Sequence, residues 1–143
     1  MKFSKILNEL IAENEITVKS LKESTGIAES TLYYYLEDKA FANLNALIKL
    51  SDYFNCSIDF LLGLTDIYSY SKPKHNKTFP EIYKELLIEH KTNNQKVSRE
   101  LGISRARYYT WKNGSQPSVT ILMQLSKYFN VSIDYLIGRS EDC

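Results

Sequence analysis

Residues 94–114 read NQKVSRELGISRARYYTWKNG, and this stretch decides the fold. Its first part, 94–101, reads as a helix that stops at Gly102, because glycine readily adopts the left-handed conformation in which helices often end. Ser104 then stands as the expected N-cap of a following helix, 105–113, which ends at an Asn-Gly pair. A helix that ends in glycine, a three-residue turn and a second helix together predict a helix-turn-helix.

The chain contains this pattern twice. NCSIDFLLG at 55–63 is matched by NVSIDYLIG at 130–138, an offset of 75 residues, and the residues further upstream match at an offset of 76. A period this long, in only two copies, indicates two tandem domains rather than a solenoid. We place the domains, called repeat 1 and repeat 2, at 1–65 and 78–143. Residues 66–77 hold three lysines and a proline and are expected to form a flexible linker.

Both repeats read as all-helical. Their first helices, which begin near Phe3 and Phe79, carry apolar residues at i, i+3, i+4, i+7 and i+8, the spacing of a helix with one buried face. The remaining predicted helices are 18–25, one within 28–39, 44–54 and a short one capped by Ser57 in repeat 1, and 94–101, 105–113, 119–129 and a short one capped by Ser132 in repeat 2. No strand signal is present, so the fold class is all-α with two five-helix domains. The same caps would also suit a generic small helical bundle.

Residues 94–138 resemble the lambda-repressor-like helix-turn-helix family, also described as Cro, phage-repressor or Xre-type. The resemblance rests on the glycine turn, on Ile103, Tyr108 and Trp111 at core positions, on the Asn-Gly pair, on the proline before 119–129 and on the closing SIDYLIG. Repeat 1 is similar to a second member of lower fidelity. The resemblance implies a double-stranded DNA partner, with the helix at 105–113 in the major groove.

The resemblance also assigns contact residues in repeat 2. The implied base-reading residues are Arg105, Ala106, Tyr109 and Thr110. The implied phosphate contacts are Asn94, Lys96, Arg107, Lys112 and Asn113. Asn94 stands where the family usually has a glutamine, which is longer by one methylene group. Arginine can bind guanine through two hydrogen bonds, so Arg105 is expected to contribute most to base recognition.

The charge distribution supports DNA contact by repeat 2 without the family. Between Lys96 and Lys112 there are five basic residues and one acidic residue, Glu100. Clustered bases in a helix-turn-helix are the electrostatic footprint expected of a nucleic-acid-binding domain. Residues 79–143 carry a net charge of +2, whereas 1–66 hold six bases and ten acids, a net charge of −4.

Repeat 1 departs from this pattern. The alignment predicts that Leu32 and Tyr35 pack inward and that Tyr33 and Tyr34 face outward, where repeat 2 has Tyr109 and Thr110. Glu37-Asp38 replaces the Asn-Gly pair and sets two negative charges where a phosphate would approach. The candidate contact residues of repeat 1 are Glu29, Ser30, Tyr33 and Tyr34.

Three roles are open for this tyrosine face. In the first role the face reads DNA weakly, with the tyrosines against thymine methyl groups or sugars. Alternatively it contacts a protein, or it covers local apolar surface. Tyrosine is enriched at protein interfaces and the neighbouring acids oppose phosphate, which favours protein contact.

Composition limits the other function classes. Two cysteines form no framework of disulfides or metal ligands, and we find no catalytic constellation, metal site, cofactor motif or small-molecule site. No run approaches the roughly 18 apolar residues of a membrane span, and no secretory signal is recognised, so a cytoplasmic, nucleoid-associated protein is expected. The sequence predicts a sequence-specific DNA-binding regulator, a repressor, acting as a homodimer or as an intrachain pseudo-dimer. The alternative is a protein-interaction module, an antitoxin or anti-repressor, acting through Tyr33 and Tyr34.

Overall fold

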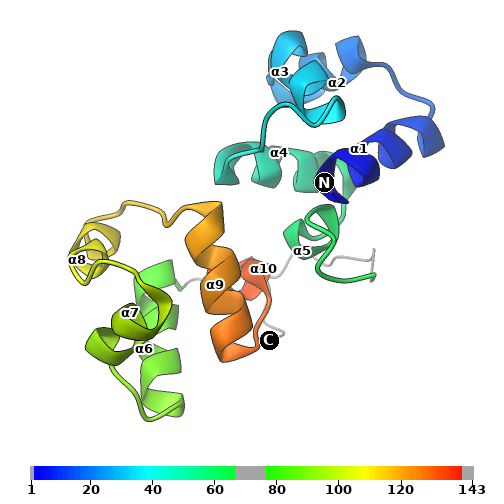
Figure 1. Ribbon diagram of the computed structural model, residues 1–143. Coiled ribbons are helices and arrows are strands. Elements are labelled where there is room, and N and C mark those ends of the chain that lie inside the picture. Colours follow the sequence, from blue (N-terminus) through cyan, green and yellow to red (C-terminus); the bar gives the residue numbers. More distant parts are fainter. Residues whose placement is uncertain (1, 67–76, 140–143) are drawn as a thin grey trace. The chain divides into compact units, whose positions relative to one another are not determined.

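The computed structural model describes residues 2–66 and 77–139 (Figure 1). The described residues form ten helices and no strand, and the chain divides into two compact units, residues 1–70 and 71–143, here called unit 1 and unit 2. The predicted all-α class with two tandem helix-turn-helix domains is confirmed. Residues 67–76 of the predicted linker lie outside the described residues. None of the helices in the described ranges has the length and apolar character needed to cross a membrane.

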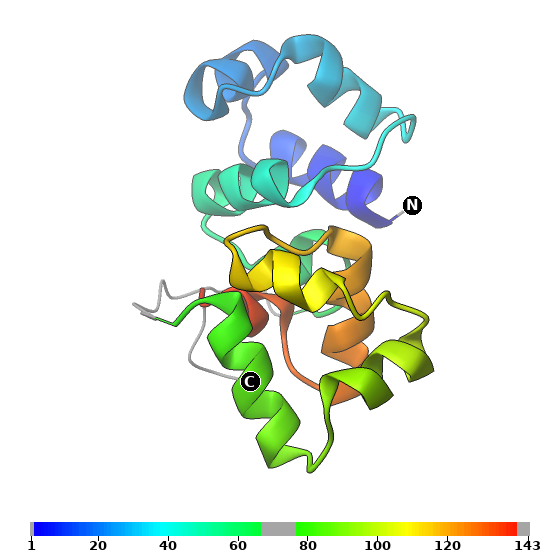
Figure 2. The same ribbon diagram turned by 90° about the vertical axis from the view of Figure 1, so that its left-hand side faces the viewer.

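The two units contain the same order of helices. Unit 1 contains α1 (Lys2–Glu13), α2 (Val18–Thr25), α3 (Glu29–Leu36), α4 (Leu44–Phe54) and α5 (Ile58–Leu61). Unit 2 contains α6 (Phe79–Glu89), α7 (Asn94–Leu101), α8 (Arg107–Lys112), α9 (Val119–Phe129) and α10 (Ile133–Leu136). Figure 2 shows α7 and α8 as consecutive helices joined by a short turn. The helix-turn-helix is therefore α2–α3 in unit 1 and α7–α8 in unit 2.

Glycine ends the first helix of each motif. Gly26 and Gly102 have φ of 76° and 70°, and each donates its N–H to a carbonyl four residues earlier, Lys22 O and Ser98 O. This is the left-handed helix end that the sequence predicts. The next helix begins three residues after Gly26, at Glu29 in unit 1, but five residues after Gly102, at Arg107 in unit 2.

The aromatic residues of unit 2 tie α8 to α6. Trp111 is buried, with its ring edge-on to Phe79 at 5.1 Å and to Tyr83 at 5.7 Å between centroids. In unit 1 Tyr35 takes the place of Trp111 and lies edge-on to Phe3 at 5.6 Å. Edge-on packing of this kind is the favoured geometry of aromatic pairs. Leu32, Tyr35 and Trp111 are buried as predicted, whereas Tyr108, also predicted to pack inward, is half-buried.

The predicted start of the third helix of unit 2 is wrong. The sequence places the helix at 105–113 with Ser104 as its cap, but α8 begins at Arg107 and its N-cap position is Ala106, which has no capping side chain. Arg107 N donates to Ser104 O at 3.1 Å and Tyr108 N to Arg105 O at 3.3 Å. These bonds span three residues rather than four, so the segment before α8 is a tight 3₁₀-type turn. In unit 1, by contrast, α3 already begins at Glu29, the position that matches Arg105.

Candidate nucleic-acid interface

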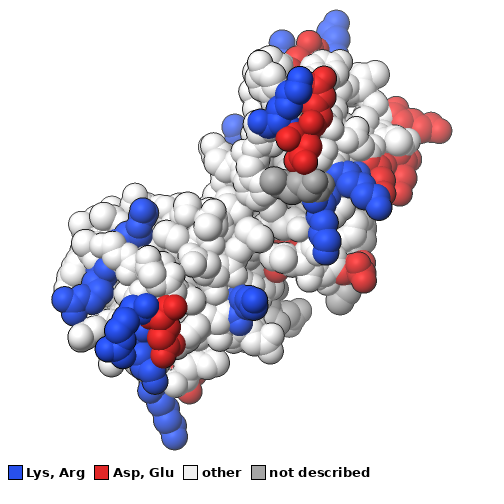
Figure 3. Space-filling view, viewed as in Figure 1, with Lys and Arg blue, Asp and Glu red and all other residues white. Residues whose placement is uncertain are grey.

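Basic side chains gather over the helix-turn-helix of unit 2, as Figure 3 shows for α7 and α8. All five bases of this stretch are exposed: Lys96, Arg99, Arg105, Arg107 and Lys112. They come from α7, from the turn and from α8, so the two helices and their connection build one positive surface. We call these five residues the basic surface.

The single acid among them, Glu100, accepts a hydrogen bond from a neighbouring helix. The Tyr128 hydroxyl, on α9, donates to Glu100 Oε2 at 2.6 Å. This hydrogen bond raises the pKa of Tyr128, because loss of the proton would set a phenolate against the carboxylate. Glu100 is thus held toward α9.

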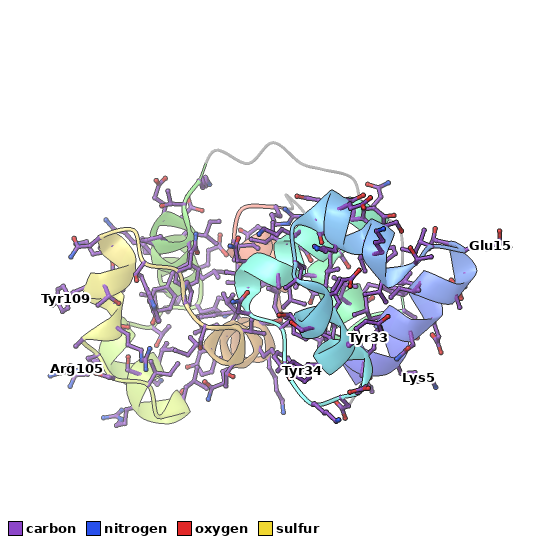
Figure 4. The ribbon with its side chains drawn as sticks, turned by 90° about the horizontal axis from the view of Figure 1, so that it is seen from above. Lys5, Glu15, Tyr33, Tyr34, Arg105 and Tyr109 are labelled. Atoms are coloured by element: carbon purple, nitrogen blue, oxygen red, sulfur yellow. The ribbon has the colours of Figure 1, made fainter. Side chains whose placement is uncertain are left out.

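The residues predicted to read bases are exposed and lie at one edge of unit 2. Arg105 and Ala106 belong to the tight turn, and Tyr109 on α8 is 67% exposed. Figure 4 shows Arg105 and Tyr109 pointing away from the unit on the same side. An open depression of about 740 Å³ is lined by Arg105, Ala106 and Tyr109 together with Asn94. The Thr110 hydroxyl is exposed but already donates to Arg107 O at 2.7 Å, so only its oxygen lone pairs are left for a ligand.

The predicted phosphate contacts have different surroundings. Lys96 and Arg107 are exposed, and Asn113 is the exposed C-cap of α8. Lys112 Nζ lies 5.6 Å from the centre of the Tyr108 ring, a cation–π contact that keeps this ammonium group at the end of α8.

Asn94 is half-buried and its side chain already makes internal hydrogen bonds. Asn94 Oδ1 accepts from the Tyr83 hydroxyl at 2.8 Å and from Ser98 Oγ at 3.2 Å. Sequence reasoning missed Tyr83, because its place on the buried face of α6 marks it simply as a core residue. It also missed Gln95, which is exposed beside Asn94 and lines the same depression. Its position next to Asn94 was the available signal.

Unit 1 presents a different surface at the matching place. Tyr33 and Tyr34 are 50% and 52% exposed. Ser30 is exposed and Glu29 half-buried, so the four candidate residues of unit 1 lie along α3. Glu37 pairs with Lys39 at 3.2 Å, with both side chains mostly exposed to solvent. The outward register of the two tyrosines is confirmed, and their ring faces remain accessible.

Comparison with known families matches both units. Residues 6–66 match the family described as Cro/C1-type HTH DNA-binding domain, and residues 84–136 match the family described as Helix-turn-helix. No curated protein and no solved structure matches the chain. The two matches cover α2–α3 and α7–α8, the helix pairs that the glycine turns define.

Proposed function

The chain belongs to the Cro/C1-type helix-turn-helix family, with two copies of the domain in tandem. On this premise we propose that it is a sequence-specific DNA-binding repressor whose unit 2 reads the major groove. Domains of this family point to a DNA-binding regulator. The observation that carries the assignment to unit 2 is the basic surface, whose Arg105 lies beside the exposed Ala106 and Tyr109. Unit 1 has Glu29, Ser30 and Tyr33 at the corresponding positions.

The geometry divides the work between base and phosphate contacts. The turn and the start of α8 would enter the groove, where the Arg105 guanidinium can grip guanine and the Ala106 methyl group can lie against thymine. Lys96, Arg107 and Lys112 flank this edge and would bind phosphates, which position the protein without reading sequence.

The salt dependence of binding should reveal these charges. With about four phosphates neutralised, the affinity for a DNA duplex is expected to fall roughly 100-fold between about 50 and 200 mM salt, because condensed counterions are released on binding. Lys112→Ala should reduce the slope of log K against log salt by about one. Fluorescence anisotropy with a labelled duplex measures both values. Binding that does not respond to salt would contradict the role of the basic surface.

Unit 1 has features of a protein-contact unit. Its net charge is −4 over residues 1–66, and Tyr33 and Tyr34 stand exposed beside Glu37 and Asp38. We propose that the tyrosine face pairs two chains, so that two copies of unit 2 read half-sites about 34 Å apart. In an intrachain pseudo-dimer, units 1 and 2 of one chain would instead occupy the two half-sites.

The oligomeric state separates these arrangements. We expect a dimer at tens of micromolar in size-exclusion chromatography with light scattering, and a monomer after Tyr33→Ser with Tyr34→Ser. Tyr109→Ser, which alters an exposed tyrosine of unit 2, is the control and should stay dimeric. A wild-type chain that is strictly monomeric at this concentration would exclude pairing through unit 1 in the absence of DNA.

The rival function is a protein-interaction module, an antitoxin or anti-repressor, that uses the same tyrosine face toward another regulator. Its supporting observation is the exposure of Tyr33 and Tyr34. This function would hold if a chain carrying Arg105→Ala and Arg107→Ala kept its full biological activity, since such a chain lacks two residues of the proposed DNA surface.

A further inference from the structure

A hydrogen-bonded cluster lies under the basic surface and connects α6 to α7. Both the Tyr83 and the Ser98 hydroxyls donate to Asn94 Oδ1, at 2.8 and 3.2 Å. Tyr83 is 1% exposed and Ser98 4% exposed. Tyr83 is therefore too deeply buried to touch a DNA phosphate, although its hydroxyl holds a residue at the edge of the proposed interface.

The cluster fixes which way round the Asn94 amide lies. Asn94 Nδ2 is 3.5 Å from Arg105 O, and a backbone carbonyl can only accept a hydrogen bond, so the NH₂ group must lie on that side. On the opposite side of the amide, the Tyr83 and Ser98 hydroxyls both donate to the amide oxygen. An NH₂ group has two N–H bonds, and the second finds no protein acceptor among the described residues. This second N–H is available to a ligand at the depression that Asn94 and Arg105 line.

Comparison of the two units indicates that the fold does not require this cluster. In unit 1 the three positions carry Leu7, Val18 and Lys22, which cannot reproduce it. The helix cap next to it is supplied separately in both units, by Thr17 in unit 1 and by Asn93 in unit 2. The same architecture thus forms with and without the cluster. The cluster accompanies the basic surface, which unit 1 lacks.

We propose that Tyr83 is a positioning residue for DNA binding, because its hydroxyl, together with that of Ser98, holds the Asn94 amide with an N–H toward a DNA phosphate. This inference rests on the proposed function, since it requires unit 2 to bind DNA. Without the hydroxyls only the 3.5 Å contact with Arg105 O orients the amide, so it turns over more readily. Its oxygen would then face the phosphate oxygens, and two acceptors cannot form a hydrogen bond.

The test is a double-mutant cycle in the full chain. Tyr83→Phe removes the hydroxyl and keeps the ring that stacks on Phe79 and meets Trp111 edge-on. We expect Tyr83→Phe to weaken binding to a duplex selected by the wild-type chain from a random DNA pool by about threefold to tenfold, the usual worth of one hydrogen bond. Asn94→Ala should weaken binding by about the same factor. The double variant should bind no more weakly than Asn94→Ala alone, because Tyr83 acts on DNA only through Asn94.

A purely structural role for Tyr83 gives a different result. Tyr83→Phe would then weaken binding equally with and without Asn94→Ala, and that outcome, or no loss at all, would overturn the proposal. Ser98→Ala, examined in the same cycle, removes the second hydroxyl from Asn94 and supplies the test if Tyr83→Phe does not fold. Urea unfolding of each variant, followed by Trp111 fluorescence, shows whether unit 2 is folded.

A parallel variant separates this inference from the function it rests on. If Arg105→Ala with Arg107→Ala binds the duplex as the wild type does, the proposed function fails and the positioning role with it. If that variant loses binding while Tyr83→Phe does not, the proposed function stands and the positioning role is wrong.

Discussion

Replacing Arg105 and Arg107 together with alanine is expected to weaken binding of the full chain to its selected DNA by about 100-fold. One arginine that grips guanine accounts for about 1–3 kcal/mol of discrimination, and one phosphate contact adds a further salt-dependent part. Both side chains are exposed, on the turn and at the start of α8, so their removal leaves no cavity. Anisotropy titration against the selected duplex and against a mixed-sequence duplex measures the loss of affinity and of specificity.

A matched control distinguishes position from net charge. Lys19→Ala with Lys22→Ala also removes two exposed positive charges, but from α2 of unit 1. This control should change the affinity far less than the arginine variant, because its charges lie outside the basic surface. Equal losses in the two variants would mean that binding depends on overall charge, and the assignment of the interface to unit 2 would be wrong.

The largest expected effect on stability is that of Leu122→Ala. Leu122 on α9 is 0% exposed, so truncation should lower the free energy of unfolding of unit 2 by about 2–5 kcal/mol through lost burial and a residual cavity. Trp111 is the single tryptophan of the chain and is buried in unit 2, so its fluorescence during urea unfolding reports that unit. The transition midpoint of the fluorescence change should therefore move to lower urea.

Unit 1 provides the control for this experiment. Leu47 on α4 is the residue that matches Leu122, and it too is 0% exposed. We expect Leu47→Ala to leave the Trp111 transition unchanged while lowering the stability reported by circular dichroism, because each unit has its own core. A shift of the Trp111 transition as large as that caused by Leu122→Ala would show that the two units unfold as one.

Much of the fold could be predicted because the chain states its pattern twice. The ends of α2 and α7 follow from Gly26 and Gly102, and the structure adds the N-cap residues Thr17 and Asn93. The inward register of Leu32 and Tyr35 followed from aligning α3 with its counterpart in repeat 2. In both cases the capping and turn residues predict the same structure as the helical periodicity, and such consistency makes a structure predictable from sequence.

The start of α8 and the Asn94 cluster could not be predicted for a common reason. Ser104 fits the N-cap preference, but the three-residue hydrogen bonds that form the turn before α8 depend on how the chain leaves α7. Tyr83 lies eleven residues before Asn94 on another helix, so their contact depends on how α6 packs against α7. Periodicity identifies the buried face of α6, but it does not show which residue the Tyr83 hydroxyl contacts.

In the proposed function, DNA binds unit 2 through the turn and α8, and it does not bind unit 1 through the tyrosine face. Amide hydrogen exchange of the full chain, compared with and without the selected duplex at one protein concentration, tests it most directly. We predict slower exchange in residues 93–113 and no change in residues 28–38 when DNA is added. Slower exchange in 28–38, with 93–113 unaffected, would contradict the account.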